Sequence, residues 1–337
     1  MLKRKFEKTL SFLRRKKIVI ITHDIVDVDG FVSCYAFQNF LNLLLKTQEP
    51  VIHFSEISKH TRSLMKNIAL YYPNIDFAFE TKTNFSSFDA CMVLDTNNLD
   101  QIKYKKELQE SEIPIIFIDH HYSSEKNFNN NFSSMNIISE QYSSTAEIIL
   151  KLYYAFNIEI SKSIKILMIA AILTDSGFFK HGDNNSIRNV SKLLDDKIDF
   201  QDILRFLDFN TDVSEKIAKI KGLQRVKLIR EGDYLIGITN VSSFGATVSS
   251  MLLKVGFDIS FVYTEEKNTS LINSRAKRNV CFKTGLHLGK ILGEIANEFR
   301  GSGGGHDGAA SISSEVEASI IIDKIIEKVK SYLQLKL

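Results

Sequence analysis

Short runs of consecutive apolar residues alternate along this chain with segments in which apolar residues recur every three or four positions. The helical spacing occurs at 31–45 and 64–71. The runs have the length and β-branched content of buried strands, and they lie at 18–21, 51–54, 90–94 and 113–118. Strands and helices in alternation form βαβ units, so we expect an α/β fold with a parallel sheet and helices on both faces.

A change of pattern then divides the chain into domains. Ser144 and Glu147 form a capping box that opens a helix over 144–150, and a second apolar helix covers 164–173. Residues 192–226 are helical and charged, without a strong strand, which favours a connection between domains. Later strands and a closing amphipathic helix are expected at 234–239, 259–263, 270–274 and 315–335. We therefore expect three parts: an N-terminal domain over 1–195, a helical linker over 196–228 and a smaller C-terminal α/β domain over 229–337.

The composition is that of a globular protein without a membrane segment. Hydrophobic residues make up 44% of the chain, and no apolar run approaches the ~18 to 20 residues that span a bilayer. The charged N-terminus is not followed by the apolar core of a signal peptide. Three scattered cysteines, Cys34, Cys91 and Cys281, suit a reducing compartment. We therefore expect a cytoplasmic protein.

The charge pattern indicates local rather than global recognition of any anionic partner. The net charge of +3 is close to neutral for 337 residues, so it does not by itself predict a nucleic-acid-binding protein. Residues 3–17 form a basic amphipathic helix by pattern. We interpret that helix as a solvated outer face, with a phosphate-backbone surface as the less favoured alternative.

Polar residues with the chemistry of metal ligands follow three of the predicted strands and one predicted helix. Because the carboxyl ends of parallel strands meet at one edge of a sheet, these side chains can converge on one cleft. In chain order they are His23, Asp27, Asp29, Asp95, Asp119, His120, His121 and Asp175. Histidines His53, His60, His181 and His287 have no such neighbours, and we expect them to be surface or packing residues.

Carboxylates and imidazoles without cysteine favour Mn²⁺, Mg²⁺ or Fe²⁺ over a structural zinc site. Several carboxylates in one cavity would repel one another, and two divalent ions that share a carboxylate would remove that repulsion and activate a water. Taken alone, Asp95 or Asp119 could equally be a helix cap or turn residue. His120 and His121 point in different directions from an extended backbone, so we expect at most one of them to bind metal.

A glycine-rich segment forms the second signal. Four glycines lie within 301–305 and are followed by His306. Consecutive glycines permit positive φ and close approach of the backbone, so their amides could surround an anion in a loop. A flexible linker is the alternative, but it does not account for the histidine and the apolar segment that follow. Arg275 follows the strand at 270–274, and its guanidinium could donate two hydrogen bonds to one phosphate.

These motifs together resemble the DHH superfamily of phosphoesterases, which is named for the triplet that stands here as Asp119, His120 and His121. More narrowly, they resemble the subfamily whose C-terminal domain ends in a GGGH motif, here Gly303, Gly304, Gly305 and His306. The resemblance covers nearly the whole chain and includes His23-x3-Asp27-x-Asp29 with the following Ser33, Asp95, Ser144 to Glu147, Asp175 to Gly177, and Arg275. Departures occur at Val26, at Gly30 to Val32 and at Ser311; none removes a ligand.

The resemblance implies two Mn²⁺ ions, with Mg²⁺ or Co²⁺ as substitutes. The first ion would be held by His23, Asp27 and Asp95, and the second by Asp29, Asp95, His120 and Asp175. His121 would face the scissile phosphate and Asp119 would orient its neighbours. Ser33, Arg275, Gly303, Gly304, Gly305 and His306 would bind substrate, and the active-site cleft would lie between the two domains.

The expected activity is a phosphodiesterase in which a metal-activated hydroxide releases nucleoside monophosphates from short single-stranded RNA or DNA. Within this class, hydrolysis of cyclic di-AMP or linear dinucleotides and exonuclease action on longer strands, as in RecJ-like enzymes, stay open. Inorganic pyrophosphatase shares the N-terminal motifs, and the GGGH motif argues against it. A non-catalytic nucleotide-binding protein with a replication or repair partner is the alternative of a different class, and the sequence leaves a homodimer open.

Overall fold

The computed structural model describes residues 2–45, 49–73, 75, 77–122, 133–208, 211–266 and 269–334. By its internal contacts the chain divides into unit 1, Met1–Phe209, and unit 2, Asn210–Leu337. The segment expected as a helical linker, 196–228, contains helix α8 (Phe200–Phe206) in unit 1 and helix α9 (Val213–Gln224) in unit 2.

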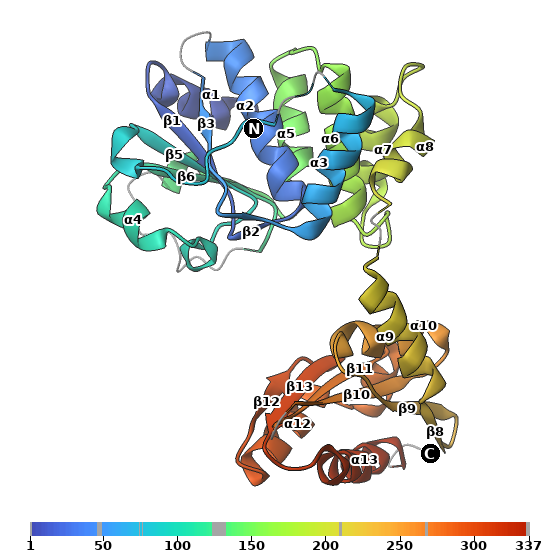
Figure 1. The fold of residues 1–337 in the computed structure, drawn as a ribbon. Coiled ribbons are helices and arrows are strands. Elements are labelled where there is room, and N and C mark those ends of the chain that lie inside the picture. The colour runs from blue at the N-terminus through green and yellow to red at the C-terminus, as the bar shows by residue number, and fades with distance from the viewer. Residues whose placement is uncertain are drawn as a thin grey trace. The chain divides into compact units, whose positions relative to one another are not determined.

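Unit 1 is built on a five-stranded parallel sheet with the order β3-β1-β5-β6-β7 (Figure 1). The central strands β1 and β5 are buried along their whole length, as expected for a parallel sheet covered on both faces. The strands are β1 (Ile18–Ile21), β3 (Val51–Ile52), β5 (Ala90–Leu94), β6 (Ile115–Asp119) and β7 (Ile137–Ile138). A separate parallel pair joins β2 (Ile25–Val26) to β4 (Glu56–Ile57).

Helices cover both faces of this sheet, which confirms the predicted α/β class. The larger core packs α2 (Val28–Leu45), α5 (Thr145–Ala155) and α6 (Lys162–Asp175) against one face (Figure 1). On the opposite face, α4 (Lys105–Glu110) and the 3₁₀ turn Phe85–Ser87 cover a smaller core. The remaining helices of unit 1 are α1 (Leu2–Leu13), α3 (Lys59–Tyr71) and α7 (Asn184–Leu193).

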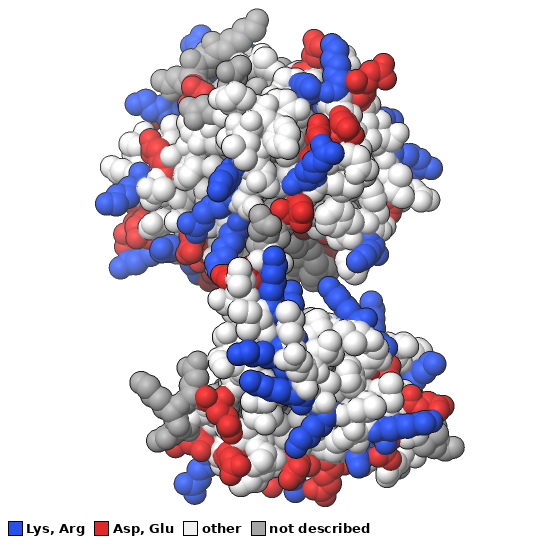
Figure 2. All heavy atoms as spheres, turned by 45° about the vertical axis from the view of Figure 1, so that its right-hand side comes forward, with Lys and Arg blue, Asp and Glu red and all other residues white. Residues whose placement is uncertain are grey.

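The predicted basic helix at the N-terminus is α1, which ends at Leu13 rather than at residue 17. It buries Phe6, Leu10 and Leu13, and the Phe6 ring lies 5.8 Å from that of Phe37 in α2. The face of unit 1 seen in Figure 2 carries basic and acidic side chains interspersed, in keeping with the small net charge.

Unit 2 contains a six-stranded mixed sheet with the order β12-β13-β11-β10-β9-β8. Only β9 and β10 are parallel; the other neighbours are antiparallel. The strands are β8 (Lys227–Glu231), β9 (Tyr234–Asn240), β10 (Ile259–Glu266), β11 (Thr269–Ala276), β12 (Ser302–Gly305) and β13 (Ala309–Ser314). Helices α12 (Leu288–Glu298) and α13 (Ala318–Gln334) share one core, α9 and α10 (Gly245–Val255) share another, and α11 (Arg278–Thr284) follows β11.

The glycine-rich segment corrects one expectation, because it is an edge strand and not a loop. Gly303, Gly304 and Gly305 belong to β12 and pair with β13. Gly304 and Gly305 have φ of +154° and +142°, values that only glycine adopts readily. A Cβ atom at Gly289 in α12 would collide with the carbonyl oxygen of Gly305, so the glycines also allow helix α12 to lie directly against the strand.

None of the helices in the described ranges is long and apolar enough to cross a membrane.

Candidate metal centre

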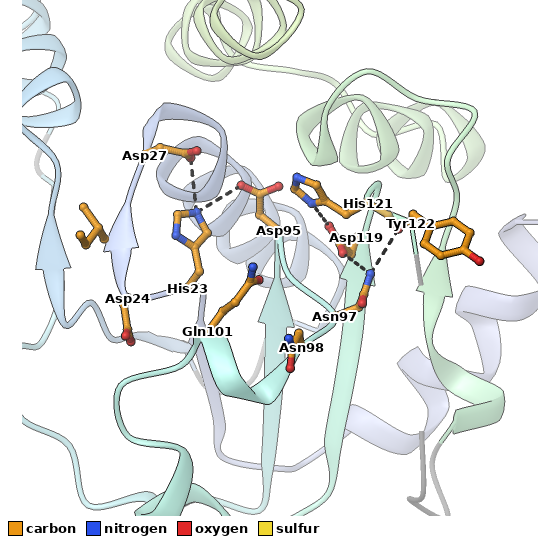
Figure 3. A pocket seen from close by; sticks show the side chains of 11 residues that line it. His23, Asp24, Asp27, Asp95, Asn97, Asn98, Gln101, Asp119, His121 and Tyr122 are labelled. Atoms are coloured by element: carbon orange, nitrogen blue, oxygen red, sulfur yellow. Dashed lines mark hydrogen bonds and ion pairs between the residues drawn. The ribbon is translucent and has the colours of Figure 1, made fainter. Parts of the chain in front are cut away.

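His23 and Asp27 come from the segment between β1 and α2, at the carboxyl edge of the sheet. The His23 Nε2 atom lies 3.6 Å from Asp27 Oδ1 and 3.7 Å from Asp95 Oδ2 (Figure 3). Burial by itself lowers the pKa of His23, but the interactions with Asp27 and Asp95 outweigh it and raise the pKa to about 10. The same imidazole, together with the Gly30 amide, holds the pKa of Asp27 below its usual value despite burial.

Asp95 lies at the centre of the cluster, directly after β5. The residue is 3% exposed, and its backbone has a φ of +60°, which is uncommon for a residue other than glycine. One oxygen, Oδ2, faces His23, while Oδ1 accepts a hydrogen bond of 2.9 Å from the Thr145 hydroxyl and lies 3.6 Å from His120 Nε2. Asp95 therefore presents one oxygen to each side of the cluster.

Asp29 is held by the N-terminus of α5. Its carboxylate accepts hydrogen bonds from the backbone amides of Thr145, at 2.6 Å, and Ala146, at 3.0 Å. Helix N-termini stabilise anions through such unpaired amides and the helix dipole. The Ser33 hydroxyl, one turn along α2, donates to the same carboxylate at 3.3 Å. Ser33 was expected to bind substrate; in the structure its side chain is fully buried and contacts Asp29.

His120 and Asp175 complete the opposite side of the cluster. His120 Nε2 lies 3.2 Å from Asp175 Oδ2, and its Nδ1 lies 3.3 Å from the carbonyl oxygen of Tyr142. Burial lowers the pKa of His120, so its imidazole is neutral near pH 7. Among the described residues, its buried Nε2 atom has no hydrogen-bond partner. A neutral imidazole nitrogen that faces two carboxylates without a hydrogen bond fits a metal ligand.

The carboxylates repel one another in this small volume. Burial, followed by the charges of Asp95, Asp175 and Asp27, raises the pKa of Asp29 well above its ordinary value. Burial, followed by Asp95 and Asp27, raises the pKa of Asp175 to about 7. Divalent cations would relieve this repulsion and favour the ionised carboxylates.

Two sets of ligand atoms each converge within 4.8 Å: one from His23, Asp27 and Asp95, the other from Asp29, His120 and Asp175. Carboxylate oxygens and imidazole nitrogens, without thiolates, suit ions such as Mn²⁺ and Mg²⁺. Asp95, expected in both sets, belongs to the first by this criterion and reaches the second through its Oδ1 atom. A further set joins Asp95 to the triplet Asp119, His120 and His121.

The three side chains of the DHH triplet differ in burial and in their contacts. Asp119 is fully buried and accepts from the His120 amide and from Asn97 Nδ2, at 2.8 and 2.6 Å. Its Oδ1 atom lies 2.8 Å from Nδ1 of His121, whose side chain is 57% exposed (Figure 3). The hydrogen bond to Asp119 outweighs the effect of burial and raises the pKa of His121 to about 9. His121 is therefore protonated at neutral pH and oriented by a buried carboxylate.

A hollow of about 580 Å³ lies beside the first ligand set. Several polar residues of the hollow were not predicted from the sequence. Asn97 and Gln101 belong to no recognisable motif, and only their position shortly after Asp95 in the chain could have indicated them. Tyr122, at the rim, is 78% exposed. The lining residues are His23, Asp24, Ile25, Asp27, Asp95, Asn97, Asn98, Gln101, Asp119, His121 and Tyr122 (Figure 3).

The Ser144 to Glu147 motif has a second role that its capping pattern did not reveal. Ser144 accepts from the Glu147 amide at 3.3 Å, as predicted, while the Glu147 carboxylate accepts from the Ser143 amide and from Asn189 in α7. Between these residues lie the Thr145 groups that bind Asp29 and Asp95. The local pattern identified the cap, and the contacts to the carboxylates depend on tertiary packing.

The remaining substrate-binding candidates lie in unit 2. Arg275 pairs with Ala309 in the sheet, and the next residue of β13, Ala310, pairs with Gly305. Arg275 and the GGGH segment therefore share one end of this sheet. The Arg275 guanidinium donates to the Ser274 carbonyl at 2.9 Å, and the His306 side chain is exposed.

Comparison with known proteins identifies the family of both domains. The family model described as "DHH family, N-terminal domain" matches residues 17–172, and the DHHA1 domain matches 235–335. An uncharacterized protein from Methanocaldococcus jannaschii is 30% identical over 322 residues, which cover 95% of this chain and 94% of the relative. The manganese-dependent inorganic pyrophosphatase of Bacillus subtilis is 30% identical over 169 residues, about half of each chain.

Among solved structures, an exopolyphosphatase-related protein from Bacteroides fragilis shares the fold with a TM-score of 0.67 at 21% identity. The superposition covers 99% of this chain and 97% of that one. Matches to both domains in the expected order, together with the near full-length relative, confirm the resemblance that the motifs indicated. This chain belongs to the DHH superfamily of phosphoesterases, enzymes that hydrolyse phosphoester bonds.

Proposed function

We propose that this protein is a two-metal phosphodiesterase that hydrolyses short single-stranded oligonucleotides to nucleoside monophosphates. The observation that carries the proposal is the pair of converging ligand sets, with Asp95 facing both, beside an open hollow. The DHHA1 match supports a substrate longer than pyrophosphate, because the pyrophosphatase alignment spans only half of this chain.

In this proposal, His23, Asp27 and Asp95 would hold one ion, and Asp29, Asp95, His120 and Asp175 would hold the second. Mn²⁺ is the proposed ion, with Mg²⁺ or Co²⁺ as substitutes. Bound ions would supply Lewis acidity towards phosphoryl oxygens and would lower the pKa of a water molecule.

His121 has a role of its own beside the ions. Its Nδ1 atom faces Asp119, so its protonated Nε2 atom is free to donate to a phosphate oxygen in the hollow. The raised pKa keeps that proton in place at neutral pH, where it can neutralise charge that develops on the phosphate or pass to the leaving oxygen. Asp119 fixes the ring and acts as a positioning residue.

The size of the hollow supports a small substrate. A volume of about 580 Å³ lies within the range of small-molecule and nucleotide sites. Exposed Tyr122 and Ile25 line it and offer apolar contacts for a base or sugar. Arg275 and the segment from Gly303 to His306 are proposed to bind a phosphate distant from the cleaved bond.

Product analysis with Mn²⁺ tests this function on a dinucleotide, a five-residue RNA, long single-stranded DNA, cyclic di-AMP and pyrophosphate. We expect the shortest linear strands to be cleaved fastest. Asp95→Asn should abolish cleavage; asparagine tolerates positive φ, so the backbone should be kept. Asp233→Asn, at an exposed turn, is the matched control. Preference for long DNA or for pyrophosphate would refute the short-strand proposal, and Asp95-independent cleavage would refute the metal site.

A further inference from the structure

Unit 2 contains a hollow of about 400 Å³ that lies outside the GGGH and Arg275 set. It is formed by α11, by the start of α12, by one residue after the GGGH motif and by the end of α13. Its lining residues are Arg278, Cys281, Phe282, Gly285, Leu286, His287, Lys290, Asp307 and Tyr332. Sequence reasoning gave none of them a binding role.

Backbone hydrogen bonds connect the walls of this hollow to the end of the GGGH motif. The amides of Leu288 and Gly289 donate to the carbonyl oxygens of Asp307 and His306, both at 2.9 Å. The Lys290 amide donates to His287. Since the first amides of α12 are all used in this way, they are not free to bind an anion, and any ligand must be recognised by side chains.

Phe282 is the first such side chain. It is 89% exposed, the largest exposure of any large hydrophobic residue in the described ranges. In the same ranges its ring packs against no other aromatic ring. An isolated phenylalanine beside a polar hollow is a platform on which a nucleobase can stack, because every base has an aromatic face.

The polar side chains of the hollow suit a phosphodiester. Within the described part of the chain, neither Arg278 nor Lys290 forms an ion pair or a side-chain hydrogen bond. The His287 Nδ1 atom accepts from the Lys290 amide at 3.2 Å, so its proton lies on Nε2, which remains a donor. The lining contains two cations and the single carboxylate of Asp307. The next carboxylate along α12, Glu294, lies outside the lining and is paired with Lys328 at 2.6 Å. The lining is therefore net positive, which suits the negative charge of an internal phosphodiester.

We propose that this hollow binds one nucleotide unit of a single-stranded substrate, with its base stacked on Phe282 and its phosphodiester held by Arg278 and Lys290. The identity of the ligand rests on the proposed function. The subsite would favour strands of two or more nucleotides, because only these contain the internal phosphodiester that Arg278 and Lys290 would bind.

The absence of tryptophan from the chain permits a direct test. Phe282→Trp places the sole tryptophan of the chain at the proposed stacking position, where it can be excited selectively over the tyrosines. With metal removed by a chelator, so that no hydrolysis occurs, we expect saturable quenching by the dinucleotide ApA and none by ribose 5-phosphate. Arg278→Gln or Lys290→Gln in this background should weaken ApA binding about five- to tenfold. Lys283→Gln removes a neighbouring charge outside the hollow and should change nothing.

Kinetics on the otherwise unchanged enzyme provide the second test. Phe282→Ala should raise KM for a trinucleotide about tenfold with little effect on kcat, because the residue is far in sequence from the ligand sets, and Phe282→Tyr should restore it. Unchanged fluorescence with ApA, or quenching that Arg278→Gln and Lys290→Gln leave intact, would overturn the subsite. If the enzyme hydrolyses no phosphodiester, the proposed function fails while the fluorescence titration still decides the subsite.

Discussion

The carboxylate cluster predicts that the metal-free protein loses stability as pH rises from 5 to 8. The folded-state pKa of Asp175 is raised from 3.8 to about 7, so the folded protein retains a proton that the unfolded chain releases. A raised folded pKa of this kind favours folding at low pH, and the gain disappears as pH approaches 7. The folded-state pKa of Asp29 is raised as well, so this carboxyl contributes with the same sign. The folded-state pKa of His121 is raised to about 9, so His121 adds a further loss of stability as pH rises above its ordinary pKa of 6.5.

The size of the effect follows from linkage. Between pH 5 and 6, the Asp175 carboxyl is mostly protonated when folded and ionised when unfolded, so that pH unit costs about 1.4 kcal/mol. The next unit costs less, because the carboxyl is half ionised at its folded pKa. The two units together correspond to about 2 kcal/mol, on the order of 4 to 8 °C in melting temperature for a domain of this size. Metal binding requires the ionised carboxylates, so Mn²⁺ should stabilise the protein more at pH 8 than at pH 5.

Thermal melting of metal-free protein across this pH range, followed by circular dichroism, measures the slope. Asp175→Asn should make the slope between pH 5 and 7 shallower, because the amide does not titrate; the contributions of Asp29 and His121 remain. Asp233→Asn, at an exposed turn, should keep the wild-type slope and controls for the loss of one carboxylate. A melting temperature that stays level from pH 5 to 8, or a slope that Asp175→Asn leaves unchanged, would show that the repulsion argument is wrong.

Three substitutions at the centre give further expected outcomes. Gly30→Ala places a methyl group 2.7 Å from the Thr22 hydroxyl and 3.3 Å from Asp95 Oδ2, so calorimetry should show Mn²⁺ affinity at least tenfold weaker; wild-type affinity would refute the close fit. Thr145→Val removes the hydroxyl that donates to Asp95 and should weaken Mn²⁺ binding about 10- to 100-fold, with Thr145→Ser close to wild type. His121→Asn should lower kcat by about 10²-fold or more while two Mn²⁺ ions still bind by metal analysis, and loss of an ion would instead make His121 a ligand.

The sequence by itself determined the scaffold and the positions of the metal-binding residues along it. The apolar runs that became β1, β5 and β6 permit few structures other than buried parallel strands. Asp95 directly follows one such strand, and Asp119 ends another. Parallel strands place such residues at one edge of the sheet, so periodicity and order along the chain were sufficient to predict that they meet.

Only the tertiary structure decided how those ligands are supported. The amides that hold Asp29 belong to Thr145 and Ala146, more than a hundred residues further along the chain, and no local pattern encodes that contact. The hydrogen bond from the Ser33 hydroxyl to Asp29 was likewise not predicted from the sequence. Sequence periodicity reports which face of an element is buried, whereas a hydrogen bond between distant segments depends on how the elements pack.

The glycine-rich segment shows the same division. Its composition indicated backbone freedom and close approach. The structure contains positive φ at Gly304 and Gly305, and close approach of the backbone at Gly305. The sequence did not reveal that the segment is an edge strand, because glycine has low β-propensity and the pairing partner, β13, lies beyond the turn. Exposure of Phe282 is likewise a tertiary property: an apolar residue in a helical pattern is expected to be buried, and only the packing of α11 leaves its ring uncovered.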